Sequence, residues 1–124
     1  MSAEAQQVFE EYVVAGAMLR DAEAVAALFA EDGVLEWPLQ RVRFAGRDEI
    51  RAALSEFYAL QPLLEADPER SRYELHASAD PDTFFVEIDT AYPGSDEMTS
   101  MAQIFRVRDG AIVRLRDYFG GQPQ

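Results

Sequence analysis

The sequence predicts an α+β fold in which helices cover one face of an antiparallel sheet. Apolar stripes at helical spacing are confined to the first half of the chain. The second half alternates apolar and polar residues between short turn signals, and Asp109-Gly110 is a hairpin signal. This segregation of helices and strands is typical of the α+β class. With 124 residues and no linker or repeat, we expect a single domain over residues 1–124.

Three helices are expected in the N-terminal half. The first covers residues 4–19. The second begins at Asp21, whose side chain suits an N-cap, and ends at Gly33. The third covers residues 46–62, carries acids near its start, where the helix dipole favours them, and is ended by Pro62. Their apolar stripes are Val8, Phe9, Tyr12 and Val13; Val25, Leu28 and Phe29; and Ile50, Leu54, Phe57 and Tyr58.

Five strands are expected. A short one at residues 34–39 follows the second helix, and Pro38 confines it to an edge or an end of the sheet. The breaks "DPD", "PGSDE" and "RDG" separate the later strands. These later strands are residues 71–79, 83–92, 98–108 and 111–119.

Strand 83–92 divides into two unlike faces. One carries Phe85, Glu87 and Asp89, and we expect this mixed face to look into the interior of the curved sheet. The opposite face is strongly apolar, so we expect a second subunit to cover it and the protein to form a homodimer. The apolar residues are Phe84, Val86, Ile88 and Tyr92.

Asp117 is the most informative residue of the chain. In "VRLRDYFGG" it shares a strand face with Leu115 and Phe119, while two arginines occupy the other face. A carboxyl group on an apolar face indicates a cavity with a placed polar group, which is typical of small-molecule pockets. The alternative is an ion pair with a neighbouring arginine. The candidate partners are Arg106, Arg108 and Arg116.

An interior pocket is expected because three short helices cannot fill the whole face of a curved sheet. Burial and neighbouring carboxylates both raise the pKa of an acid, and a raised pKa suits proton transfer near neutrality. The candidate catalytic acids are Asp117, Asp89, Glu36 and Glu87. The candidate substrate-binding residues are Trp37, Phe57, Phe85, Met101, Gln103, Leu115 and Phe119. For Asp89 and Glu87, a register error of one residue would place both acids in solvent instead.

Composition excludes several classes of function. The net charge of −12 argues against nucleic acid and anionic membranes as partners and leaves a small molecule. The N-terminus lacks signal-peptide features, so we expect a cytoplasmic protein; the absence of cysteine is compatible with a reducing cytoplasm but does not indicate the compartment. No metal-ligand spacing or phosphate-binding loop occurs, so we expect neither metal nor cofactor. The single histidine, His76, is expected on a polar face, and a catalytic role for it is the less favoured interpretation.

The segments "RDAEAVAALFAEDGVLEWPL", "FAGRDEIRAAL" and "DGAIVRLRDYF" resemble the SnoaL-like branch of the NTF2-like superfamily. That branch includes polyketide cyclases, ketosteroid isomerases and limonene-1,2-epoxide hydrolases. The resemblance covers nearly the whole chain. It implies a cone-shaped α+β barrel that usually dimerises, with three N-terminal helices over one face of a curved antiparallel sheet and a pocket inside.

The epoxide hydrolases carry an aspartate in a closing "RDYF" motif, which corresponds to Asp117. Their second aspartate corresponds to Asp89, but Glu87 stands where they have an arginine. Their tyrosine and asparagine correspond to Val34 and Glu36, so this chain keeps the two acids and lacks the other three groups.

In the ketosteroid isomerases, the base precedes a proline of the first strand, where this chain has Trp37. Their oxyanion tyrosine corresponds to Val13 or its neighbour Tyr12, and their oxyanion aspartate to Met101. The polyketide cyclases use an acid–base aspartate of the last strand, which corresponds to Asp117.

The expected function is cofactor-independent carboxylate acid–base catalysis on a small, mostly apolar metabolite. The resemblance implies a cyclase, isomerase or hydrolase reaction. The alternative is a non-catalytic module of the same fold that binds a small ligand or dimerises.

Overall fold

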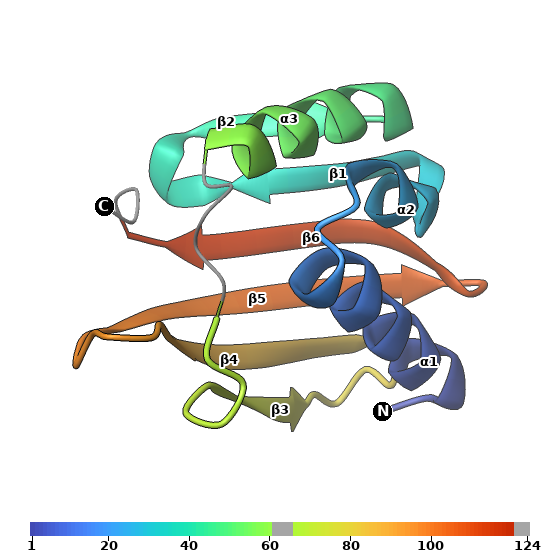
Figure 1. The fold of residues 1–124 in the computed structure, drawn as a ribbon. Coiled ribbons are helices and arrows are strands. Elements are labelled where there is room, and N and C mark those ends of the chain that lie inside the picture. The colour runs from blue at the N-terminus through green and yellow to red at the C-terminus, as the bar shows by residue number, and fades with distance from the viewer. Residues whose placement is uncertain (61–65, 121–124) are drawn as a thin grey trace.

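A computed structural model, which describes residues 1–60 and 66–120, shows helices packed on one face of a six-stranded curved sheet (Figure 1). The predicted α+β class is confirmed. The elements in chain order are α1 (Ala3–Tyr12), the π-helix η1 (Val13–Met18), α2 (Ala22–Ala27), β1 (Phe29–Trp37), the 3-10 helix η2 (Pro38–Gln40), β2 (Val42–Ala45), α3 (Arg47–Leu60), β3 (Arg72–Ala77), β4 (Thr83–Ala91), β5 (Met98–Arg108) and β6 (Ala111–Phe119).

The sheet has the strand order β2-β1-β6-β5-β4-β3. Strands β3 to β6 form the expected antiparallel meander. The pair β1–β6 is parallel, with Leu35 beside Leu115, so the sheet is mixed rather than wholly antiparallel. These two strands are far apart in the sequence, and no tight hairpin fixes their relative direction. Because β2 and β3 remain at the two edges, the sheet is open and forms a cone rather than a closed barrel.

The helices begin where the sequence predicts, but the second one is shorter. Ser2 caps α1 and Asp21 caps α2, each side chain accepting a hydrogen bond from a backbone amide at 3.1 Å. The predicted stop of the third helix at Pro62 lies outside the described residues. No helix within the described residues combines the length and the apolar character needed to cross a bilayer.

Gly33 does not end a helix, as the sequence pattern predicted, but lies inside β1. A Cβ added to Gly33 would lie 2.8 Å from the carbonyl oxygen of Ile112 on β6. Because Gly33 has no side chain, the backbones of β1 and β6 can approach closely at the irregular start of their pairing. Strand β2, which no sequence pattern predicted, pairs with β1 beyond it.

The face predicted for strand 83–92 is wrong, and the true orientation is inverted. Phe84 and Val86 are fully buried under the helices, whereas Phe85 is 39% exposed on the outer face. Strand pairing explains the error, because Val86 lies opposite Gln103, which lies opposite Asp117. The face that carries Val86 is therefore the inner one.

Helix α1 covers this apolar face within the same chain. Figure 1 shows α1 lying across the middle of the sheet, while α2 and α3 lie over its β1 end. The ring of Phe9 meets those of Phe84 and Phe105 edge-on, at centroid distances of 5.8 and 5.9 Å. The apolar face thus needs no second subunit, which removes the stated reason for a homodimer. The homodimer itself stays a prediction.

Adjacent phenylalanines of β4 offer a direct test of this orientation. We expect Phe84→Ala to lower the free energy of unfolding by about 3–5 kcal/mol, because it empties a fully buried site. Phe85→Ala removes a ring from the outer face and should cost less than about 1 kcal/mol. Urea unfolding of the two variants measures the difference. Equal losses would contradict the assigned faces.

Candidate functional site

Asp117 projects from β6 into the covered side of the sheet, where it is 7% exposed. Two side chains from neighbouring strands hold its carboxylate. Gln103 of β5, its direct pairing partner, donates from Nε2 to Oδ1 at 2.8 Å. Trp37, the last residue of β1, donates from Nε1 to Oδ2 at 3.3 Å. Both carboxylate oxygens are therefore occupied by donors that the sheet itself positions.

Gln103 extends this network to the helix layer. Its Nε2 also donates to the hydroxyl of Tyr12, at the end of α1, at 3.1 Å. Its other amide atom, Oε1, is buried and has no hydrogen-bond partner within the described residues. A buried acceptor without a donor is costly, so this oxygen is the place in the network where an N–H or O–H group from outside fits.

No arginine contacts Asp117. The candidate partners Arg106 and Arg116 project from the outer face of the sheet, and within residues 1–60 and 66–120 Asp117 makes no ion pair. Burial without a counter-charge raises the pKa of Asp117 from 3.8 to about 6, and the hydrogen bonds from Gln103 and Trp37 offset part of that rise. The ion-pair alternative for Asp117 is therefore not what the structure shows.

Aromatic side chains form the wall beside this carboxyl group. The Trp37 ring lies 5.0 Å from that of Phe44, 5.6 Å from that of Phe57 and 5.7 Å from that of Phe119, measured between centroids. These rings are only half-buried, so they reach from the core to the surface. An apolar wall with a few placed polar groups is the usual composition of a small-molecule site.

Two tyrosines, Tyr12 and Tyr58, complete the surroundings. Neither was among the candidate site residues, although the ketosteroid isomerase resemblance pointed to Tyr12 or its neighbour Val13. A Cβ built on Gly16 would lie 3.6 Å from the Tyr58 hydroxyl and 3.8 Å from the Tyr12 ring, so both tyrosines converge on Gly16. Burial, followed by the nearby charge of Asp117, raises the pKa of Tyr12 well above its usual value and that of Tyr58 to about 12. A π-helical turn, η1, follows Tyr12 directly, and such turns are frequent at functional sites.

The structure brings seven of the eleven candidate residues to the inner face or the wall around Asp117. Phe57 comes from α3, and Met101 lies opposite Phe119 in the β5–β6 pair. The other members of this group share the face of Asp117 or bond to it. The seven are Trp37, Phe57, Met101, Gln103, Leu115, Asp117 and Phe119.

The remaining four candidates lie on the outer face, which corrects the predicted cluster of acids. Glu36 is paired with Arg116 at 3.7 Å. Asp89 accepts hydrogen bonds from Ser100 and Arg72, and these hold its pKa below the usual range. The exposed pair Phe85 and Glu87 also faces outward. The physical reason is the alternation of a strand, which turns every side chain over when the register moves by one residue.

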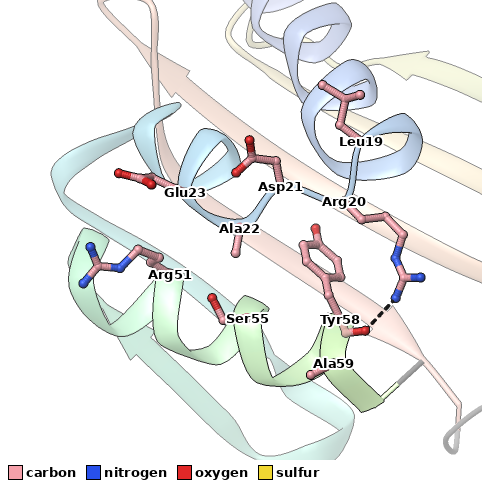
Figure 2. Close-up of a pocket in the computed structure, with 9 residues that line it drawn as sticks. All are labelled: Leu19, Arg20, Asp21, Ala22, Glu23, Arg51, Ser55, Tyr58 and Ala59. Atoms are coloured by element: carbon pink, nitrogen blue, oxygen red, sulfur yellow. Dashed lines mark hydrogen bonds between the residues drawn. The ribbon is translucent and has the colours of Figure 1, made fainter. Parts of the chain in front are cut away.

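A separate solvent-open groove lies on the helix side of the molecule (Figure 2). It measures about 810 Å³ and runs between the start of α2 and α3. Arg20 closes one side, donating to the backbone oxygen of Tyr58 at 3.0 Å with its guanidinium 5.3 Å from the ring centroid. Asp117 does not line this groove. Tyr58 connects the two, because it lines the groove and the charge of Asp117 contributes to its raised pKa.

Fold and site together define the class of protein. A curved sheet covered on one face by helices is the NTF2-like fold. The model of the SnoaL-like domain matches residues 9–115. The chain belongs to the SnoaL-like domain family. No curated protein matches the sequence.

Solved structures agree with this fold. A steroid delta-isomerase from Pseudomonas aeruginosa has a TM-score of 0.72 at 19% identity over 98% of this chain and 83% of its own. An NTF-2-like protein from Burkholderia xenovorans has a TM-score of 0.67 at 18% identity, over 98% and 86%. An LEH-like epoxide hydrolase from M. tuberculosis has a TM-score of 0.64 at 22% identity, over 96% and 84%. At such identities the likeness establishes the fold and not the reaction.

Because the pKa of Asp117 is raised in the folded protein, the free energy of unfolding should depend on pH. Between its ordinary pKa of 3.8 and its folded pKa of about 6, folded Asp117 keeps a proton that the unfolded chain has lost. Asp117 therefore lowers stability as the pH rises through this window. The free energy of unfolding of Asp117→Asn, minus that of the unsubstituted protein, should grow by about 2 kcal/mol between pH 4 and pH 7. Urea unfolding at a series of pH values measures this difference.

Asp89 supplies a control of opposite sign. Its pKa is lowered by Ser100 and Arg72, so its stabilising contribution is present at neutral pH and is lost as the pH falls. Asp89→Asn should therefore lose stability at neutral pH and not at low pH. If the Asp117→Asn difference stays constant from pH 4 to pH 7, the carboxyl group is not held in an apolar environment.

Proposed function

We propose that this protein is a cofactor-independent enzyme that moves a proton within a small, mostly apolar molecule, with Asp117 as the acid–base group. One observation carries the proposal: Asp117 is a buried carboxyl group without a cation, and its pKa lies near 6. Groups with a pKa close to neutrality are the most effective proton carriers at physiological pH. The SnoaL-like fold, whose relatives include isomerases and hydrolases by description, is consistent with such a role.

At neutral pH the Asp117 carboxylate is mostly ionised and acts first as the base. It takes a proton from a carbon or hydroxyl group of the substrate, which leaves the negative charge on the substrate and a neutral carboxyl group in the apolar site. It then returns the proton to a different atom of the same molecule. Gln103 and Trp37 orient the carboxylate through the whole cycle, because each donates to a different oxygen.

The two tyrosines do not compete for this role. Because the pKa of Tyr12 is raised well above 10.0 and that of Tyr58 is about 12, both phenols keep their protons at physiological pH. They therefore serve as hydrogen-bond donors rather than as bases. A protonated phenol close to the base is suited to stabilise the negative charge that forms on a substrate oxygen.

One carboxylate favours isomerisation or ring closure over two-acid hydrolysis. Asp89, the second acid that the epoxide-hydrolase resemblance implied, lies on the outer face of the sheet and is bound to Arg72. A mechanism in which Asp89 and Asp117 act on one water molecule is not compatible with this separation. A single base that returns the proton it has taken needs no second acid.

The same network defines the ligand that fits. The aromatic wall around Trp37 favours an apolar body. The unpartnered oxygen of Gln103 favours a hydroxyl or N–H group on that body. The candidate substrate is therefore an enolisable ketone or a related carbonyl compound that carries one hydrogen-bond donor.

A non-catalytic ligand-binding module is the second candidate. The aromatic wall and Gln103 describe a binding site equally well, and neither requires a reaction. The raised pKa separates the two functions, because a binding site gains nothing from a proton carrier near neutrality.

Hydrogen–deuterium exchange tests proton abstraction without knowledge of the natural substrate. A panel of cyclic hydroxyketones is incubated in D₂O with the protein, and loss of the α-proton signal is followed by NMR. We expect exchange above the buffer rate for at least one compound, and a loss of about 10²–10⁴-fold in Asp117→Asn, the range for a general acid–base group.

Asp89→Asn is the matched control, since it removes one carboxylate from the outer face and should leave the exchange rate unchanged. Exchange that survives Asp117→Asn contradicts the proposal. Saturation-transfer signals from bound ketones without any exchange favour the binding module instead.

A further inference from the structure

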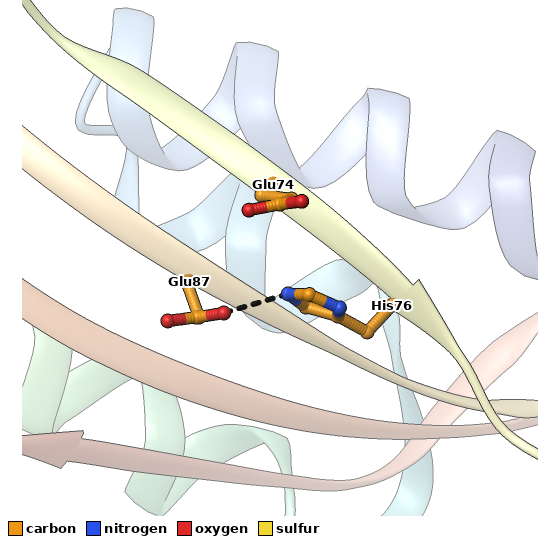
Figure 3. Close-up of side chains that lie close together, drawn as sticks. All are labelled: Glu74, His76 and Glu87. Carbon is orange, nitrogen blue, oxygen red and sulfur yellow. Dashed lines mark hydrogen bonds and ion pairs between the residues drawn. The ribbon is translucent and has the colours of Figure 1, made fainter.

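We propose that Glu74, His76 and Glu87 form a binding site for one divalent transition-metal ion, for which Zn²⁺ is the test ion (Figure 3). The three side chains lie on the outer face of the sheet, at its β3 edge, on the side opposite Asp117. The site is independent of the proposed catalytic function.

Strand geometry brings the three ligands together. Glu74 and His76 are two residues apart on β3, so their side chains project from the same face. Glu87 lies directly opposite Glu74 in the antiparallel β3–β4 pair. One nitrogen or oxygen atom from each side chain lies within 4.8 Å of those from the other two. The backbone of two paired strands, rather than a loop, fixes this spacing.

The imidazole of His76 is held toward the two carboxylates. Its ring stacks on Phe85, its direct pairing partner, with centroids 4.8 Å apart and planes inclined by 13°. Its Nε2 lies 2.7 Å from Oε1 of Glu87. The stacked ring leaves Nε2 pointing into the cluster, as Figure 3 shows, so the softest ligand of the set is already oriented.

Charge also favours a bound cation. Two glutamates directly opposite each other on one face of a strand pair repel and destabilise the pair. The nearest arginine of β3, Arg72, is bound to Asp89 at 3.3 Å. Within the described residues Glu74 has neither a hydrogen-bond nor an ion-pair partner for its side chain. A divalent ion between the three side chains neutralises both carboxylates at once.

The ligand set selects the kind of metal. Calcium and magnesium prefer sites made of oxygen atoms only, whereas an imidazole combined with carboxylates suits zinc, copper or nickel. Zinc bonds of about 2.0–2.2 Å hold tetrahedral ligands roughly 3.4 Å apart, and water commonly takes the fourth position. The separation of 4.8 Å is thus closed by small rotations of the exposed glutamates, and the ion replaces the hydrogen bond between His76 and Glu87.

His76 is the only histidine of the chain, which gives the test a direct spectroscopic signal. Zn²⁺ is titrated into the full chain, without any affinity tag, at neutral pH. Calorimetry gives the stoichiometry and Kd, and ¹⁵N NMR follows the His76 ring nitrogens. We expect one ion per chain, a shift of the Nε2 resonance that saturates with the calorimetric signal, and no competition from excess Mg²⁺.

Three variants separate this site from general attraction of cations to an acidic protein. His76→Asn and Glu87→Gln should each weaken zinc binding at least tenfold, because each removes a ligand. Glu36→Gln removes a charge from the same outer face at β1, far from the cluster, and should leave the Kd unchanged. Circular dichroism confirms that each variant is folded.

Two results would overturn the proposal. In the first, stoichiometric binding persists in His76→Asn or leaves the ring nitrogens unshifted, so that the ion sits elsewhere. In the second, binding never saturates, or Glu36→Gln weakens it as much as Glu87→Gln does, so that only diffuse attraction to the surface is present.

Discussion

The hydrogen bonds that Trp37 and Gln103 donate to the Asp117 carboxylate are the interaction on which the site depends. They join β1, β6 and β5, three strands that are adjacent in the sheet but come from opposite ends of the chain. Through Gln103 the same network reaches Tyr12 and therefore the helix layer. A buried carboxylate is tolerated only when such donors satisfy it. The mixed topology of the sheet, with β1 parallel to β6, is what supplies the tryptophan donor.

Alternation within a single strand was enough to predict that Asp117 lies on an apolar face. The pattern of the last strand placed this acid on the face of Leu115 and Phe119, and the structure has it there, buried and without an arginine partner. The same rule correctly placed Gln103 and Met101 on the inner face of β5. The Asp21 cap of α2 and the Asp109-Gly110 hairpin were equally local signals. Such features are predictable because they depend on neighbours in the sequence.

The orientation of β4 was predicted wrongly, although its two faces differ in composition. The strongly apolar face, which carries Phe84 and Val86, was assigned to a second subunit, whereas helix α1 of the same chain covers it. The pairing of Val86 with Gln103 and of Gln103 with Asp117 fixes the orientation, and a pattern within one strand does not contain this information. Tyr58 was missed as a site residue, and Tyr12 entered only through the ketosteroid isomerase resemblance, as an alternative to Val13. On their helices they look like ordinary members of an apolar stripe, and only the packing of α1 and α3 brings them to Asp117.

The central claim is that the pKa of Asp117 is raised toward neutrality, to about 6, because its surroundings are apolar and uncharged. Carbon-detected NMR titration of the side-chain carboxyl carbons tests it directly, with the signal that disappears in Asp117→Asn assigning the resonance. The account predicts a midpoint of about 6 for Asp117, clearly above its ordinary 3.8. A midpoint at or below 3.8 would mean that the carboxylate is solvated or paired with a cation, and it would contradict both the site and the function proposed for it.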